Sequence, residues 1–211
     1  MLLQTESLQL ALDLVGVFVF ALSGGLMAVS SGLDLFGVLV LAAVAGLGGG
    51  VLRDLLIGVV PPVGVSDWRP LVVCLLAGLL TFRWHRQAAR LSRPVRVLDA
   101  AGLAAFSVSG ALMALSVGAG ATTAVLVGGI TAVGGGVLRD LLVGRIPEVL
   151  RRELYALPAL AGAALIVIAD RVGILGGLVV WGAALAVFVL RMVAVVFDLH
   201  VPTALRARED R

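Results

Sequence analysis

The sequence predicts an all-α integral membrane protein whose seven transmembrane helices form two inverted three-helix repeats and a seventh helix. Hydrophobic residues make up 61% of the 211 residues and charged residues 14%, which is too little polar surface for a soluble domain. Apolar stretches of about 18 residues recur, the length that crosses about 30 Å of hydrocarbon. The segment 48–58, GGGVLRDLLIG, returns at 134–144 with one change, Ile57 to Val143.

The first half of the chain, residues 8–84, contains three predicted helices. We expect them at residues 8–29, 35–60 and 68–84. The glycines at 48–50 interrupt the second helix, and the part before them is only about 20 Å long, so it cannot span alone. We therefore predict one span made of two half-helices, kinked at the glycines. Trp68 and Trp84 fit interfacial anchors at the ends of the third helix.

The second half, residues 97–169, repeats the first at a constant offset of 86 positions. The offset relates Asp13 to Asp99 and Pro61 to Pro147. The predicted helices lie at residues 97–117, 121–145 and 154–169, with the glycines at 134–136 breaking the middle one. A seventh helix at 172–197 and a polar tail at 198–211 complete one transmembrane domain over residues 1–211.

Three spans per repeat place the two repeats in opposite orientations, and the arginines test this independently. With the N-terminus outside, the inner segments and the span ends next to them hold eleven arginines, whereas the outer side holds only Arg69 and Arg171. The inner set is Arg83, Arg86, Arg90, Arg93, Arg96, Arg145, Arg151, Arg152, Arg206, Arg208 and Arg211. The positive-inside rule therefore predicts an outer N-terminus and a cytoplasmic C-terminus. Residues 1–7 contain no basic residue and no clear cleavage site follows, so we expect the first helix to be retained and not cleaved as a signal peptide.

Several function classes are excluded by the residues available. The basic residues are all arginines grouped between apolar segments, without the interleaved aromatics of a nucleic-acid surface. Cys74 is the only cysteine and sits in an apolar run, and His85 and His200 are far apart, so we expect no metal site. No nucleophile–base arrangement or nucleotide loop appears, so we expect neither an enzyme nor a cofactor.

The two glycine triplets allow two interpretations. Small residues let membrane helices pack closely. Three consecutive glycines also favour a kink or local unwinding, and the carbonyls freed there are tolerated only in protein or beside a wet cavity, where they bind cations. The candidate pore and kink residues are Gly48, Gly49, Gly50, Gly134, Gly135 and Gly136.

An Arg-Asp pair follows each triplet, Arg53-Asp54 and Arg139-Asp140. Charges at such a depth must face the bundle interior and pair. They either line a pathway or form a clamp between repeats, with Arg53 on Asp140 and Arg139 on Asp54. Both roles are compatible.

Four further polar residues are candidates for the pathway. Asp13 and Asp99 begin helices, where a carboxylate can instead complement the helix dipole. Ser23 and Ser109 can hydrogen-bond across helices or back onto their own helix. Arg191 is expected to snorkel toward the inner face.

Twin Gly-Gly-Gly-x-x-Arg-Asp motifs in inverted repeats, followed by a seventh helix, resemble the prokaryotic trimeric intracellular cation (TRIC) channel family. The resemblance covers about residues 8–197. It implies a homotrimer in the bacterial inner membrane, with one pore per subunit that passes monovalent cations, K⁺ more than Na⁺. The sequence also resembles a group of bacterial membrane proteins in which relatives are described as glycine transporters.

The sequence is therefore compatible with two functions: a monovalent cation channel, or a secondary transporter of a small solute such as glycine. Inverted repeats with broken helices suit both. The sequence does not separate them, because a small glycine-lined centre fits either an ion or a small solute.

Overall fold

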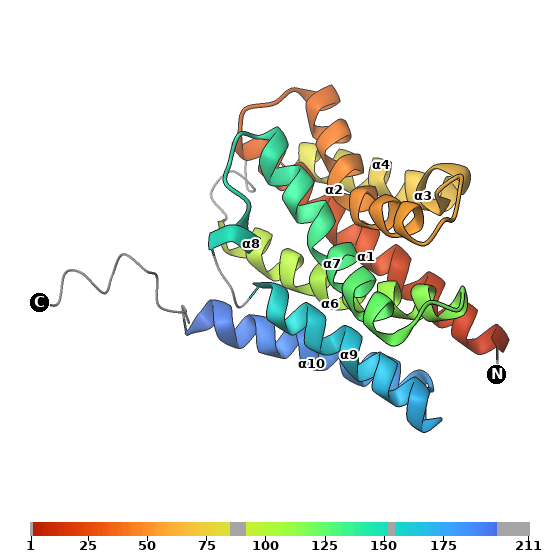
Figure 1. Cartoon of the computed structure of the whole chain (residues 1–211). Coiled ribbons are helices and arrows are strands. Elements are labelled where there is room, and N and C mark those ends of the chain that lie inside the picture. The colour runs from red at the N-terminus through yellow and green to blue at the C-terminus, as the bar shows by residue number, and fades with distance from the viewer. Residues whose placement is uncertain (1, 85–91, 152–154, 198–211) are drawn as a thin grey trace, which may run out of the picture.

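The computed structural model describes residues 2–84, 92–151 and 155–197, and within these ranges every regular element is a helix (Figure 1). The helices are α1 (Leu2–Ser30), α2 (Leu35–Leu56), α3 (Val63–Ser66), α4 (Trp68–Arg83), α6 (Ser92–Ser116), α7 (Ala121–Leu142), α8 (Glu148–Arg151), α9 (Ala156–Val172) and α10 (Gly177–Val196).

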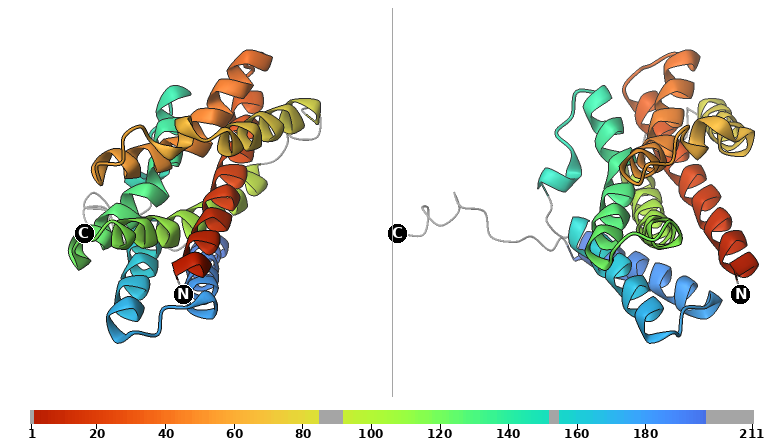
Figure 2. Two further views of the ribbon diagram at one scale, coloured as in Figure 1. Left: turned by 90° about the vertical axis from the view of Figure 1, so that its right-hand side faces the viewer. Right: turned by 45° about the vertical axis from the view of Figure 1, so that its right-hand side comes forward.

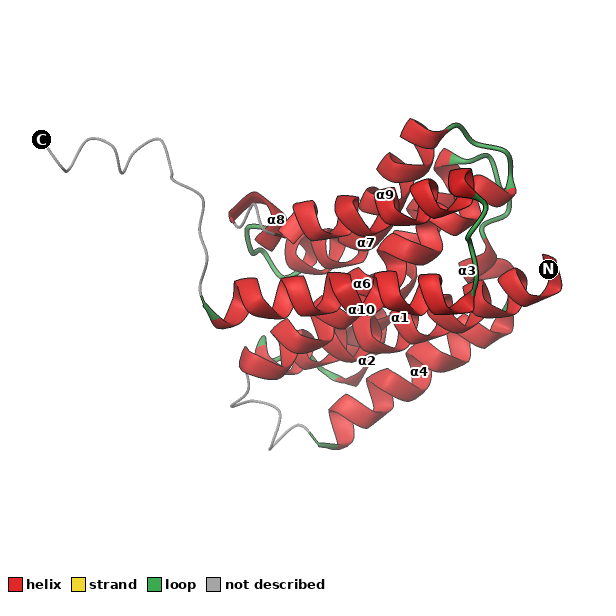
Figure 3. Ribbon diagram, turned by 90° about the horizontal axis from the view of Figure 1, so that it is seen from below, coloured by secondary structure: helices red, strands yellow, loops and turns green. Residues whose placement is uncertain are grey.

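The helices pack in the same pattern in each half of the chain. Helices α1, α2 and α4 contact one another, and so do α6, α7 and α9. The halves meet where α1 packs on α6 and α2 packs on α7 (Figure 2). Helix α10 lies against α6 and α9 (Figure 3), at the bottom of the view of Figure 1, whereas α4 lies near its top. The centre of the molecule is therefore built from α1, α2, α6 and α7.

Helices α1 and α6 pack through two matching contacts. In each contact, a phenylalanine ring of one helix lies on a glycine of the other. The rings of Phe20 and Phe106 stack with centroids 5.5 Å apart. A Cβ added to Gly16 would lie 2.5 Å from the Phe106 ring, and one added to Gly102 would lie 2.5 Å from the Phe20 ring. These glycines are therefore packing residues, and the 86-residue offset relates both pairs.

The predicted fold class is confirmed: the protein is all-α and multi-pass. Five of the described helices are long and apolar enough to span a membrane, α1, α2, α6, α7 and α10. Helices α4 and α9, with 16 and 17 residues, occupy the places of the other two predicted spans. The short helices α3 and α8 were not predicted.

Helices α2 and α7 end earlier than predicted, at Leu56 and Leu142 instead of residues 60 and 145. The cause is a glycine two residues beyond each end. Gly58 and Gly144 have φ of +77° and +70°, a left-handed conformation that terminates a helix. The seventh helix, α10, begins five residues later than predicted because α9 continues to Val172 and stops before Gly173, at φ +78°.

The glycine triplets do not divide α2 and α7 into two half-helices, so this part of the prediction is wrong, whereas a kink at the glycines within a continuous helix stays a prediction. Each helix is continuous over 22 residues, including the glycines. At 1.5 Å per residue this is about 33 Å, enough for one span without a break. Glycine lowers helix propensity but does not remove the backbone donor, so a helix supported by neighbours on several sides persists through it.

Part of the basic surface predicted to face the cytoplasm lies outside the described residues. Arg86, Arg90, Arg152 and the arginines of the tail belong to this part, as do His85 and His200. Cys74 is buried in the core, as expected of a packing residue.

Candidate functional site

The first of two buried charge clusters is centred on Arg53, whose side chain is 3% exposed. Its Nη1 donates to both carboxylate oxygens of Asp13, at 2.8 and 3.0 Å, and its Nε donates to Asp54 Oδ1 at 2.8 Å. Asp54 Oδ2 accepts the backbone N–H of Val63 at 2.8 Å. This set joins α1, α2 and α3, and we call it the first cluster.

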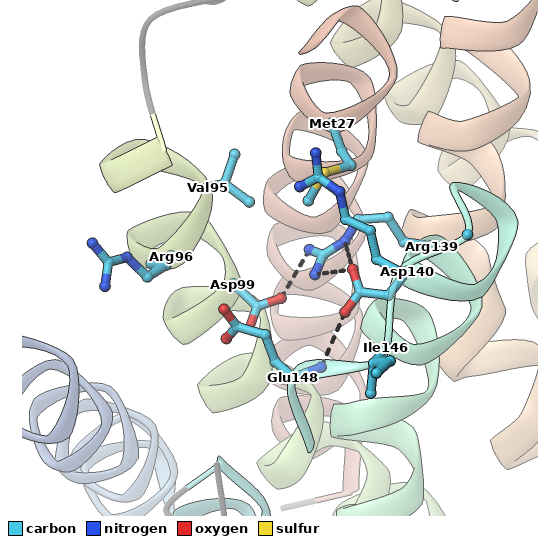
Figure 4. A pocket seen from close by; sticks show the side chains of 10 residues that line it. Met27, Val95, Arg96, Asp99, Arg139, Asp140, Ile146 and Glu148 are labelled. Atoms are coloured by element: carbon cyan, nitrogen blue, oxygen red, sulfur yellow. Dashed lines mark hydrogen bonds and ion pairs between the residues drawn. The ribbon is translucent and has the colours of Figure 1, made fainter. Parts of the chain in front are cut away.

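The second cluster is centred on Arg139 and has the same plan (Figure 4). Arg139 Nη1 donates to Asp99 Oδ1 at 3.0 Å and to the Ser23 hydroxyl at 2.5 Å. Its Nε donates to Asp140 Oδ1 at 2.9 Å, and Asp140 Oδ2 accepts the N–H of Glu148 at 3.2 Å. The cluster therefore joins α6, α7 and α8, and Ser23 adds α1 of the other repeat.

The local sequence explains why the same arrangement forms twice. Each arginine lies in the last turn of its helix, where a cation complements the helix dipole. The aspartate that follows points past the helix end and binds the first N–H groups of the next short helix, which the glycine turn brings back toward it. Asp13 and Asp99 reach the arginines from α1 and α6, the helices packed beside α2 and α7.

The predicted clamp between repeats, with Arg53 on Asp140 and Arg139 on Asp54, is wrong. Each arginine instead binds the aspartates of its own repeat. The reason is the packing of α1 on α2 and of α6 on α7, which supplies a nearer carboxylate than the opposite repeat does. Of the hydrogen bonds that the arginines of the two clusters make, the bond from Arg139 to Ser23 joins the repeats.

Asp13 and Asp99 do not act as dipole partners in a first helical turn. The helices α1 and α6 start at Leu2 and Ser92, well before these residues, and both carboxylates are bound to arginine. Ser23 also joins a cluster, as one of its two predicted roles requires. Ser109 is fully buried, and its hydroxyl has no hydrogen-bond partner within the described part of the chain.

Four of the six candidate glycines lie where α2 crosses α7. A Cβ at Gly49 would collide with the Thr131 carbonyl oxygen, and one at Gly135 would collide with the Ala45 carbonyl oxygen. Gly48 and Gly134 face the side chains of Leu138 and Leu52, where a Cβ would lie 2.6 and 2.9 Å away. The two backbones therefore approach as closely as glycine permits, which supports the packing interpretation of these four residues.

The third glycine of each triplet differs between the repeats. A Cβ on Gly50 would meet nothing within 4 Å. A Cβ on Gly136 would lie 2.8 Å from the Tyr155 hydroxyl and 3.4 Å from Asp99 Oδ1. Gly136 therefore makes room for the second cluster, whereas Gly50 borders open space.

The two clusters also differ in the space beside them. A cavity of about 620 Å³ reaches the second cluster (Figure 4). Its lining is Met27, Val95, Arg96, Asp99, Arg139, Asp140, Gly144, Arg145, Ile146 and Glu148. The cavity beside the first cluster, which Asp13, Arg53 and Gly50 help to line, has only about 40 Å³. Of these two cavities, the one beside the second cluster is thus much the larger.

Sequence reasoning missed Glu148 and Tyr155, and it misplaced Arg191. Arg191 is 1% exposed on α10, so it does not snorkel. It donates to Glu148 Oε2 at 3.0 Å, and its guanidinium lies 4.5 Å from the centroid of the Tyr155 ring. The 86-residue offset carried a signal for Glu148 and Tyr155. The matched positions of the first repeat hold Pro62 and Arg69, so the two repeats differ there.

Among the described residues, no group of three or more His, Cys, Asp or Glu side chains is placed to hold a metal ion. The two clusters provide buried charges and hydrogen-bonding groups, and the second cluster adjoins the large cavity. Such an arrangement suits the binding or passage of a small polar species more than bond-making chemistry.

Sequence relatives are membrane proteins. The profile of the family described as "Glycine transporter" matches residues 10–86 and again residues 96–171. The chain is 49% identical over 194 residues to the UPF0126 membrane protein SCO4104 of Streptomyces coelicolor, covering 92% of this chain and 89% of the relative. It is 45% identical over 152 residues to the inner membrane protein YadS of Escherichia coli, covering 72% and 73%.

Solved structures of similar sequence have the same fold. The TRIC channel orthologue of Rhodobacter sphaeroides superimposes with a TM-score of 0.87 at 38% identity, over 90% of this chain and 98% of the other. A structure described for conductance through TRIC cation channels gives a TM-score of 0.83 at 37% identity, over 92% and 95%. The chain therefore belongs to the glycine transporter family of membrane proteins by its sequence profile, and to the prokaryotic trimeric intracellular cation (TRIC) channel family by its similarity to the solved structures.

Proposed function

We propose that this protein is a monovalent cation channel that passes K⁺ more readily than Na⁺, with one pore in each subunit of a homotrimer. The observation that carries the proposal is the composition of the two buried clusters. Each holds two carboxylates and one guanidinium, so each has a formal charge of −1. The proposed channel uses no cofactor, only the permeant ion.

The depth of these charges makes their sign important. Arg53, Asp54, Arg139, Asp99 and Asp140 are all buried. A charge in a low-dielectric interior acts over a longer range than one in water, since little solvent screens it. Two sites of net negative charge on the two sides of the α2–α7 crossing lower the energy of a cation between them and raise that of an anion.

The cavities suggest where the pore lies. The cavity of about 620 Å³ gives access to the second cluster, and the smaller cavity of about 40 Å³ borders the first. Between them lie the glycine crossing of α2 with α7 and the stacked Phe20 and Phe106. In this conformation the proposed route is open on one side, and conduction requires a shift at the crossing.

The relatives support the assembly and the location. The Rhodobacter protein is named as a trimeric channel and YadS as an inner membrane protein. We extend both to this chain, with the N-terminus outside as the arginine distribution predicts. The large cavity then faces the cytoplasm, because Arg96 and Arg145, which line it, belong to the predicted inner segments.

A secondary transporter of a small solute such as glycine is the second candidate, and the inequality of the two cavities favours it. An alternating-access carrier in one of its end states is open on one side only, around a site between inverted repeats. The description of the family profile points the same way.

Flux from proteoliposomes separates the two functions. With purified protein, we expect K⁺ efflux that needs no solute, is somewhat slower for Na⁺, and exceeds Cl⁻ flux. Empty liposomes are the control. Saturable glycine uptake coupled to an ion gradient, with no K⁺ flux in the absence of glycine, is the result that contradicts the channel and supports the carrier.

A further inference from the structure

Tyr155, at the start of α9, lies behind the second cluster as seen from the large cavity. It is 1% exposed, and its hydroxyl hydrogen-bonds to the Asp99 carboxylate. Asp99 lines the cavity of about 620 Å³, whereas Tyr155 belongs to the apolar core cluster that contains Phe20 and Phe106. The tyrosine therefore stands between the inner end of this cavity and the core.

Three groups converge at Gly136, the third glycine of its triplet. A Cβ on Gly136 would lie 2.8 Å from the Tyr155 hydroxyl, 3.4 Å from Asp99 Oδ1 and 3.8 Å from the Phe20 ring. The matched glycine of the first repeat, Gly50, has nothing within 4 Å of its Cβ position. The tyrosine hydroxyl thus fills a space beside the third glycine that the first repeat leaves open.

The two repeats differ at the position of this tyrosine. The 86-residue offset relates Tyr155 to Arg69, whose side chain is 47% exposed and pairs with Asp67. A group that points outward in the first repeat is thus replaced by one that points into the core in the second.

Arg191 of α10 holds the ring of the tyrosine. Its guanidinium lies 4.5 Å from the centroid of the Tyr155 ring, within the range of a cation–π interaction. Arg191 is 1% exposed, and such an interaction is stronger when water is excluded from it. Helix α10 is therefore connected to Asp99 through Tyr155.

A second connection runs from Arg191 to the same cluster. Arg191 Nη2 donates to Glu148 Oε2 at 3.0 Å, and the backbone N–H of Glu148 donates to Asp140 Oδ2 at 3.2 Å. Glu148 also lines the large cavity. Both aspartates of the second cluster, Asp99 and Asp140, are thus joined to one arginine of α10.

We infer that Tyr155 is a positioning residue of the proposed pathway, which it closes at the inner end of the large cavity. The inference rests on the proposed function. The hydroxyl fixes Asp99 in place and fills the space at Gly136, so the route from the cavity toward the crossing of α2 and α7 widens when Tyr155 leaves Asp99. Arg191 opposes that movement, and α10 thereby stabilises the closed arrangement.

Tyr155→Phe separates this role from simple packing, because it removes the hydroxyl and keeps the ring. We expect the variant to fold and its K⁺ flux per folded protein in proteoliposomes to rise about tenfold, since the closed arrangement loses a hydrogen bond to a charged group. A side chain that only fills the core would leave the flux unchanged or lower it. Flux at or below the wild-type value in the folded variant therefore overturns the positioning role.

Substitutions of Arg191 test the part played by α10. Arg191→Gln removes the charge over the tyrosine ring, so K⁺ flux should rise as it does in Tyr155→Phe. Arg191→Lys keeps a cation over the ring and should remain close to the wild type. Arg171→Gln, at an exposed position of α9, is the matched control with wild-type flux. Equal flux in Arg191→Gln and Arg171→Gln contradicts control by α10.

A spectroscopic test needs no flux, because Tyr155 is the only tyrosine of the chain. Protein labelled with ¹³Cζ-tyrosine gives one NMR resonance in detergent, which reports the surroundings of the hydroxyl. We expect Asp99→Asn and Arg191→Gln to shift it, and Arg171→Gln to leave it in place. A resonance that does not respond to Asp99→Asn overturns the link to the cluster, and one that does not respond to Arg191→Gln overturns the link to α10.

Failure of this inference and failure of the channel give different results. Wild-type K⁺ flux that Tyr155→Phe does not raise contradicts the positioning role and leaves the channel standing. A tyrosine resonance that responds to Asp99→Asn and to Arg191→Gln, in a protein without K⁺ flux, contradicts the channel and supports the links from α10 to the cluster.

Discussion

Arg139 holds side chains from three helices in one place: Ser23 of α1, Asp99 of α6 and Asp140 of α7. The residue is 2% exposed, so its charge is compatible with the core only because these partners surround it. The same holds for Arg53 with Asp13 and Asp54. At this scale, the clusters are structural pairs and sources of net negative charge at once.

A double-mutant cycle tests the pairing. Arg139→Gln leaves two buried carboxylates without their cation, and we expect a loss of about 3 kcal/mol of stability in detergent. Combining it with Asp99→Asn should recover part of that loss, because one uncompensated charge is removed. Combining it with Asp54→Asn should give additive losses, since Asp54 belongs to the other cluster. Recovery of stability with Asp54→Asn instead would support the rejected pairing of Arg139 with Asp54 across the repeats.

At the scale of elements, the glycines of one triplet have different environments at the crossing of α2 and α7. The carbonyl of Thr131 lies against Gly49, and nothing lies within 4 Å of where a Cβ on Gly50 would be. The triplet is therefore one motif in sequence and two different environments in the structure. Periodicity cannot reveal this, because the neighbour on the opposite helix decides it.

Alanine substitutions separate these environments. Gly49→Ala forces the backbones apart, and we expect it to destabilise the protein by about 1–3 kcal/mol and to lower K⁺ flux. Gly50→Ala gains helix propensity without a clash, so its stability should stay the same or rise by up to about 1 kcal/mol. Thermal unfolding in detergent and proteoliposome flux measure the two effects. Equal behaviour of both variants would mean that close packing is not what Gly49 provides.

Helix α10 has no counterpart in the repeats, and Arg191 ties it to the second repeat through Glu148 and Tyr155. Arg191→Leu breaks a buried pair, so we expect a loss of about 2 kcal/mol, less than a fully buried pair costs because Glu148 is 30% exposed. Thermal unfolding of Arg191→Leu against Arg171→Leu, at an exposed position, measures it. Equal midpoints for both would show that Arg191 does not hold α10.

On the scale of the whole molecule, much of the architecture could be read from the sequence. The offset of 86 residues and the apolar spans predicted the all-α membrane fold and the residues Arg53, Asp54, Arg139 and Asp140 as buried charges. The partners of those charges could not be read, because they depend on which helices touch. Glu148 and Tyr155 were missed for a related reason: their roles come from contacts that Glu148 of α8 and Tyr155, at the start of α9, make with Arg191 of α10.

The inequality of the two cavities is a property of the whole molecule that the near-identical motifs do not suggest. Cysteine labelling tests which side is open, in a background where Cys74 is replaced by Ala. Met27→Cys, in the lining of the large cavity, should react with a membrane-impermeant thiol reagent added from the cytoplasmic side. Leu10→Cys, beside the small cavity, should react slowly from either side. Labelling of Met27→Cys from outside only would reverse the predicted topology.

The most direct measurement of the central claim is the reversal potential of currents through the purified protein in a planar bilayer, under a KCl gradient. A cation channel with net negative charge in both buried clusters predicts discrete current steps that reverse near the K⁺ equilibrium potential. Currents that reverse near the Cl⁻ potential, or no steps from a protein that takes up glycine in liposomes, would contradict it.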